Sequence, residues 1–140
     1  MSITTIHAAL CDTLDSGSLG FVDRNRGRKQ QLPWQSETLA PLWVPNFLRS
    51  RPIKRTNLSQ TYERVYEING FFPFNYEAKS DEKWLVYLSA LELLLSPQPA
   101  IVLCTQTFPP NMMENNHVVY CEVECHHVRA EFTVWEVLDG

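Results

Sequence analysis

The fold is decided by a stretch near the middle of the chain, Ser59-Gln-Thr-Tyr-Glu-Arg-Val-Tyr-Glu-Ile-Asn-Gly-Phe-Phe72. Successive side chains of a β-strand point to opposite faces. Tyr62, Tyr66 and Ile68 therefore share one face, with Arg64 between them. The other face carries Thr61, Glu63, Val65 and Glu67. This alternation predicts a strand over residues 59–72, half buried and ended by Pro73.

Helical spacing appears on both sides of this strand. Over residues 80–96 it places six bulky side chains on one face: Trp84, Tyr87, Leu88, Leu91, Leu94 and Leu95. Pro97 ends this helix. Over residues 2–15 it aligns Ile3, Ile6, Leu10 and Leu14 before the glycines at 17 and 20. We therefore expect two amphipathic helices.

Three further strands are expected after the second helix, over residues 100–105, 118–128 and 130–138, with a break at Pro109-Pro110-Asn111. The order of these elements predicts an α+β fold: one small domain of residues 1–140, with a mostly antiparallel β-sheet packed against two α-helices.

Residues 21–58 contain four prolines within twenty residues: Pro33, Pro41, Pro45 and Pro52. Proline lacks the backbone N–H that regular structure needs. We therefore expect an extended, basic, proline-rich arm or loop, with a short extended piece at Leu42-Trp43-Val44. Trp34, Trp43 and Phe47 would order this arm, either within the fold or against a partner.

The net charge of −4 over 140 residues conceals an uneven distribution. Residues 24–64 hold nine basic and two acidic side chains, a local charge of +7, whereas residues 65–140 hold three basic and eleven acidic ones. This asymmetry is typical either of a solvated basic loop on an acidic domain or of a subunit whose basic side meets an acidic neighbour.

Two stretches match the patterns of metal sites only in part. Cys121, Cys125, His126 and His127 have spacing unlike that of zinc sites, and strand alternation sends the two histidines to opposite faces. His7 and Cys11 are their only candidate partners on the first helix. Glu77-Ala78-Lys79 matches half of a metal-dependent nuclease signature, but no aspartate lies in residues 56–76. We expect no metal and no cofactor.

Other functional classes lack their sequence signals. The chain has no catalytic serine elbow, phosphate-binding loop, membrane span or signal peptide by pattern, and four cysteines without a secretory signal are typical of reduced thiols. Glu122 and Glu124 form either a carboxylate pair or a solvated sheet face. We expect no catalytic residues and no enzyme activity.

Three stretches carry a resemblance to a known family: the first helix, the sequence Arg64-Val-Tyr-Glu-Ile-Asn-Gly, and the closing Ala130-Glu-Phe-Thr-Val-Trp-Glu-Val. In order of elements the chain resembles the tail-terminator or tail-completion proteins of long-tailed bacteriophages. The resemblance implies a structural virion protein, made in the host cytoplasm, that forms a homo-oligomeric ring, commonly of six subunits. Such a ring joins the tail tube protein to the head–tail connector proteins and meets DNA only through its lumen.

On this hypothesis the subunit or partner interface consists of basic and aromatic residues of the arm: Arg24, Arg26, Arg28, Lys29, Trp34, Trp43, Phe47, Arg49, Arg51, Lys54 and Arg55. Two alternatives remain open. One is a small accessory binding protein, such as an inhibitor or ligand-binding module, and the other is a metal-dependent nuclease.

Overall fold

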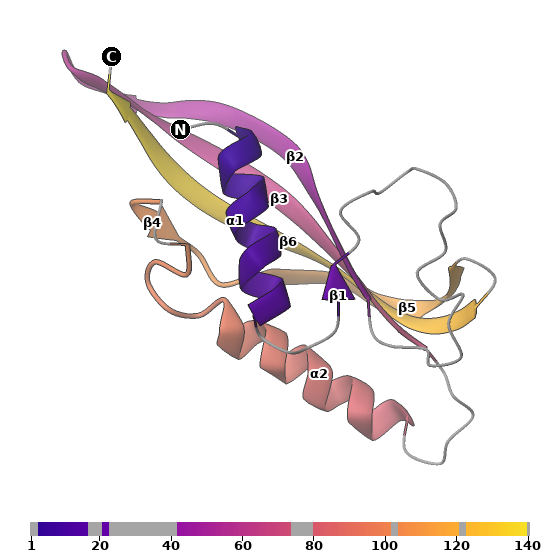
Figure 1. Cartoon of the computed structure of the whole chain (residues 1–140). Coiled ribbons are helices and arrows are strands. Elements are labelled where there is room, and N and C mark those ends of the chain that lie inside the picture. The colour runs from indigo at the N-terminus through magenta and orange to yellow at the C-terminus, as the bar shows by residue number, and fades with distance from the viewer. Residues whose placement is uncertain are drawn as a thin grey trace.

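A single twisted sheet forms the body of the molecule, with both helices on one of its faces (Figure 1). The computed structural model describes residues 3–16, 21–22, 42–73, 80–101, 104–120 and 123–139. In chain order the elements are α1 (Ile3–Ser16), β1 (Phe21–Val22), β2 (Leu42–Arg55), β3 (Ser59–Pro73), α2 (Ser80–Leu94), β4 (Gln106–Thr107), β5 (Asn111–Tyr120) and β6 (Val123–Asp139). The predicted α+β single domain is confirmed.

The two longest strands, β3 and β6, pair antiparallel at the centre of the sheet from Ser59↔Asp139 to Pro73↔Cys125. β2 pairs with the outer side of β3, and β5 and β4 pair with successive stretches of the outer side of β6. Among the described strands, only β1 runs parallel to its neighbour, β2. A helix followed by a two-stranded hairpin therefore occurs twice along the chain: α1 with the β2–β3 hairpin, and α2 with the β5–β6 hairpin. The second strand of each hairpin, β3 or β6, lies in the middle of the sheet.

The core lies between the helices and the inner face of the sheet. The stripe Ile6, Leu10 and Leu14 of α1 is fully buried against it. From α2 come Trp84, Tyr87, Leu91 and Leu95, and from the central strands Tyr66, Ile68, Phe132 and Val134. Both helical stripes and the Tyr66–Ile68 face were expected from spacing, and the structure confirms them.

Aromatic and polar contacts hold each helix in place. Trp43 of β2 stacks on Tyr87 of α2 with ring centroids 4.5 Å apart. His7 Nε2 donates to the Pro45 carbonyl oxygen at 3.0 Å, and the Tyr66 hydroxyl donates to the Ile3 carbonyl oxygen at 2.9 Å, so α1 is bound to both β2 and β3.

Within residues 21–58, the short extended piece expected at Leu42-Trp43-Val44 is confirmed as the start of β2, whereas the prediction of an arm or loop is wrong for residues 45–55. Leu42–Arg55 is a fourteen-residue strand, and residues 56–58 form the turn to β3. Pro45 and Pro52 are tolerated because β2 is an edge strand: in the described part of the chain only the two residues of β1 pair with its outer side. β-Bulges between Phe47 and Arg49 and between Pro52 and Lys54 absorb the irregularity. Residues 23–41 of the predicted arm lie outside the described residues.

Two predicted strands also need correction. The expected strand over residues 118–128 is split between β5 and β6, which form a hairpin with Tyr120 opposite Val123. The alternation of residues 118–128 continues through this hairpin, so sequence alone does not reveal it. Of the strand expected over residues 100–105, Val102 and Leu103 lie outside the described residues and the other four are not in a strand; a short strand follows at Gln106–Thr107, where the Gln98 side-chain amide pairs with the backbone of Thr107.

Candidate subunit interface

The basic residues of β2 form an exposed band along the edge of the sheet. Arg49, Arg51, Lys54 and Arg55 are all exposed, and no acidic residue lies between them in sequence. Arg49 pairs with Glu131 at 3.1 Å and Arg51 with Glu63 at 2.9 Å. Lys54 and Arg55 form no ion pair with any described residue. We call these four residues the basic edge.

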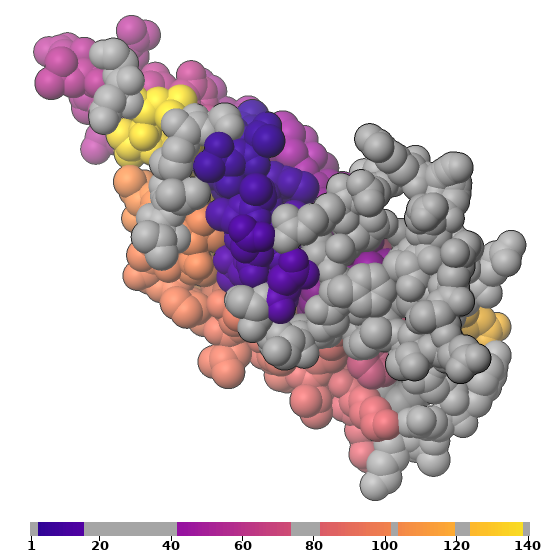
Figure 2. Space-filling view, in the orientation of Figure 1, coloured from indigo at the N-terminus to yellow at the C-terminus, as the bar shows by residue number. Residues whose placement is uncertain are grey.

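The basic edge leads into a hairpin tip that stands clear of the helices (Figures 1 and 2). The Thr56 hydroxyl oxygen accepts the backbone N–H groups of Leu58 and Ser59, which orders the turn. Leu58, at its apex, is 76% exposed, and Phe47 and Leu48 are also exposed at the other end of the basic edge. The hairpin is thus preorganised, positively charged and partly apolar, features suited to binding another macromolecule.

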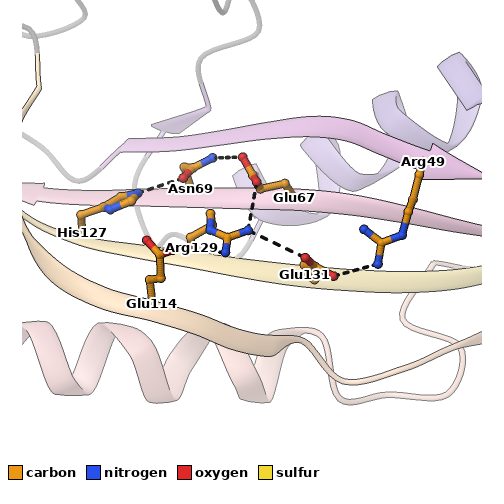
Figure 3. A network of polar contacts seen from close by, with 7 residues as sticks. All are labelled: Arg49, Glu67, Asn69, Glu114, His127, Arg129 and Glu131. Carbon is orange, nitrogen blue, oxygen red and sulfur yellow. Dashed lines mark hydrogen bonds and ion pairs between the residues drawn. The ribbon is translucent and has the colours of Figure 1, made fainter.

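The outer face of the sheet carries a network of alternating charges (Figure 3). Glu131 lies between Arg49 and Arg129, and Arg129 also contacts Glu67 at 3.4 Å and Glu114 at 3.3 Å. These residues come from β2, β3, β5 and β6. Because the pairs are partly solvated, each contributes about 0–1 kcal/mol, so their effect is mainly to fix side-chain positions across the strands.

At one end of this network, His127 joins β6 to β3 and β5. Asn69 Nδ2 donates to Glu67 Oε1 at 2.7 Å, which turns Asn69 Oδ1 toward His127 Nε2 at 2.8 Å. A carbonyl oxygen only accepts, so Nε2 carries the ring proton. Asn116 Oδ1 lies 3.1 Å from Nδ1, and the Asn116 amide turns its NH₂ group toward this nitrogen when the ring is neutral. Burial lowers the pKa of His127, which favours the neutral ring.

The opposite charge gathers on the exposed sides of the two helices. Exposed acidic side chains are Asp12 and Asp15 of α1 and Glu82 and Glu92 of α2, and Lys83 is the one exposed basic side chain among the described helical residues. α2 also exposes three large apolar side chains, Leu85, Val86 and Leu93, at 58%, 69% and 76%. We call these three residues the α2 outer face.

The α2 outer face is not among the interface residues predicted from the sequence. A signal was present, because Leu85, Val86 and Leu93 lie outside the stripe of Trp84, Leu91 and Leu95 that spacing assigns to the core, with Glu82, Ser89 and Glu92 among them. The described elements cover only one side.

The structure places some of the predicted interface residues at the surface and one in the core, and does not describe the others. Arg24, Arg26, Arg28, Lys29 and Trp34 lie outside the described residues. Trp43 is fully buried, so it belongs to the core and the prediction that it serves the interface is corrected. Phe47 is 39% exposed and packs edge-on against Tyr66. Together with Phe47, the basic edge is the part of the predicted interface that the structure brings together at the surface.

No known family model and no curated protein sequence matches this chain.

The described residues offer little for metal or nucleophilic chemistry. No three histidine, cysteine or acidic side chains among them are placed to hold a metal ion. His126 faces the core and His127 the outer face, as strand alternation predicts, whereas Cys121 and Glu77-Ala78-Lys79 lie outside the described residues. Burial, with the Glu136 carboxylate second, raises the pKa of the Cys104 thiol to about 11, so this thiol is protonated and unreactive.

A shallow groove crosses the outer face beside the basic edge. Its lining combines charge with an indole ring: Arg51, Ile53, Lys54, Thr61, Glu63, Thr105, Trp135 and Val137. Trp135 Nε1 and Arg51 both donate to Glu63, and the Arg51 contact, the larger cause, lowers the pKa of that carboxyl.

No described helix is long and apolar enough to cross a membrane.

Proposed function

We propose that this protein is a structural virion protein, a tail-terminator or tail-completion protein whose copies form a ring. The ring, of about six subunits, joins the phage tail tube to the head–tail connector. The proposal includes no enzyme activity and no cofactor. DNA would meet the protein only in the ring lumen.

One observation carries the assembly part of this proposal: the molecule exposes two different surfaces of opposite charge, each with large apolar side chains. A head-to-tail ring contact is heterologous, so every subunit must present two different and complementary surfaces. The basic edge with Leu58 is one such surface, and the acidic sides of the helices with the α2 outer face form the other. A monomer has no need of either apolar cluster in water.

The tail assignment is supported by the resemblance in sequence. The stretches that carry it fold as α1, the middle of β3 and the end of β6. Their order in the chain, with α2 between the two strands, is the order on which the resemblance was based.

The proposal is tested by the mass of the purified protein in light scattering, followed by binding to purified tail tubes. One chain has a mass of 16.2 kDa. We expect particles of about five or more subunits, visible as rings by electron microscopy, or rings that close on the tube end. A protein that stays monomeric and fails to bind tail tubes would overturn the proposal.

The groove beside Trp135 favours the second candidate, a small binding module. Arg51 and the Trp135 N–H are engaged by Glu63, so Lys54 and the indole ring are the groups in this groove that suit an anionic ligand with a flat ring. A monomer whose Trp135 fluorescence changes with such a ligand, and whose response is lost in Trp135→Leu, would favour this candidate over the ring.

A further inference from the structure

The α2 outer face is a surface that the described fold leaves uncovered. Trp84, Leu91 and Leu95 already bind α2 to the sheet from the other side. Leu85 and Leu93 lie two helical turns apart on one side, with the exposed Ser89 between them and Val86 next to them. Exposed leucine and valine at this density mark an interaction surface.

The charge around this patch is acidic. Glu82 and Glu92 flank Leu85 and Leu93 on α2, whereas Lys83 lies on the far side of Val86 by helical spacing. Asp12 and Asp15 lie on the second half of α1, whose Leu10 and Leu14 share the core with Leu91 and Leu95. Among the helical side chains that the structure describes, the exposed charged ones are four acids and one base, so the patch attracts a basic partner.

A surface of this complementary kind exists on the same chain. The β2–β3 hairpin presents the basic edge, in which Arg49 and Arg51 are paired with Glu131 and Glu63 whereas Lys54 and Arg55 form no ion pair with a described residue, together with the exposed Leu58 and Leu48. In Figure 1 the hairpin tip projects at one end of the sheet, whereas α2 crosses below the other half, so the tip points away from its own α2. The two surfaces can meet only between different copies.

We propose that the β2–β3 hairpin of one copy binds the α2 outer face of the next copy, with Leu58 and Leu48 against Leu85, Val86 and Leu93. The basic edge then lies opposite Glu82, Glu92, Asp12 and Asp15. This inference rests on the proposed self-assembly and names its contact. Since donor and acceptor surfaces differ, every added copy leaves one of each free until a ring closes.

The test is a matched pair of substitutions at exposed apolar positions. Leu93→Glu places a charge in the proposed contact, and we expect it to weaken assembly by more than about tenfold. Val119→Glu is the control, because Val119 is 68% exposed on β5, away from the contact, and should leave assembly unchanged. Both variants should keep the wild-type circular dichroism, since neither side chain is in the core.

A second measurement identifies the two partners directly. One preparation carries Leu58→Cys and another carries Leu93→Cys, and the two are mixed with a short bismaleimide. We expect an interchain product in the mixture and far less in either preparation alone.

The outcomes separate this contact from the proposed function. Rings that survive Leu93→Glu and give no mixed product would overturn the contact and leave the ring intact. Mixed product from a closed dimer that binds no tail tube would support the contact and overturn the ring. A wild-type protein that never self-associates would overturn the contact.

Discussion

Gly70 of β3 is required because the Trp43 ring lies over its backbone. A Cβ added at Gly70 would lie 2.5 Å from Trp43 Cζ3 and 2.9 Å from Val128 Cγ1. Trp43 cannot move aside, since its other face stacks on Tyr87. We expect Gly70→Ala to destabilise the fold by about 1–3 kcal/mol in urea unfolding. Thr61→Ala, in the same strand on the outer face, should cost less than about 1 kcal/mol; equal costs would contradict this account.

Arg64 and Glu136 form a buried ion pair at the edge of the core. Arg64 Nε and Nη2 both contact Glu136 Oε1, at 2.9 and 2.8 Å, and Arg64 Nη1 donates to the Ser50 hydroxyl. Glu136 is fully buried, and its Oε2 accepts no hydrogen bond from the described residues. An imperfectly satisfied buried pair of this kind contributes little net stability, although losing one partner is expensive.

This asymmetry predicts a strongly non-additive mutant cycle. Arg64→Met leaves the Glu136 carboxylate buried without its cation and should cost about 3–5 kcal/mol. The double variant Arg64→Met with Glu136→Leu should recover most of that loss, because no buried charge remains. Chemical denaturation of the wild type, both single variants and the double variant measures the coupling. Additive costs would show that the two side chains do not act as a pair.

At the scale of elements, β2 shows why a proline count is a poor guide. Proline excludes a strand from the middle of a sheet because it removes a ladder donor. At an edge the missing N–H can face away from the neighbouring strand, so Pro45 and Pro52 fit opposite Ile68 and Tyr62. The same prolines and bulges also discourage nonspecific pairing along this exposed edge.

The outer-face network makes the packing of β3, β5 and β6 sensitive to pH through His127. Its pKa is lowered in the folded protein, so the unfolded chain takes up this proton at higher pH. The stability from the neutral ring is therefore complete above about pH 6.5 and is lost as the pH falls through the lowered folded value.

We expect the wild type to lose stability to urea between about pH 7.5 and pH 5, and His127→Gln to lose less. Glutamine retains hydrogen bonding to Asn69 without a titrating group. Urea midpoints of both proteins at several pH values check this. An identical pH dependence in the two proteins would show that His127 does not contribute.

For the whole molecule, the relevant feature is the separation of charge between sheet edge and helices. Reversing the basic edge with Arg49→Glu, Arg51→Glu, Lys54→Glu and Arg55→Glu should prevent assembly at physiological salt, because like charges would then face each other. Light scattering measures the result. Replacing the three arginines by lysine keeps the charge and should preserve assembly. A charge-reversed protein that still assembles would contradict the electrostatic account.

Sequence patterns determined much of the element list. Periodicity located α1, β3 and α2 to within one or two residues of their observed ends, because each buries one face and the spacing of buried side chains is a local property. The uneven distribution of charge was likewise evident from the amino-acid sequence, and it predicted a basic interface that includes Arg49, Arg51, Lys54 and Arg55.

Only the tertiary structure decided the pairing of strands and which surfaces stay uncovered. Whether Leu42–Arg55 is a loop or an edge strand depends on β3, and whether Trp43 faces a partner or the core depends on Tyr87. Leu93 and Leu91, two residues apart, lie on opposite sides of α2; helical spacing predicted the Leu91 side as buried, and only the arrangement of the other described elements leaves the Leu93 side uncovered. These differences arise from contacts between residues distant in sequence, and local patterns carry no record of them.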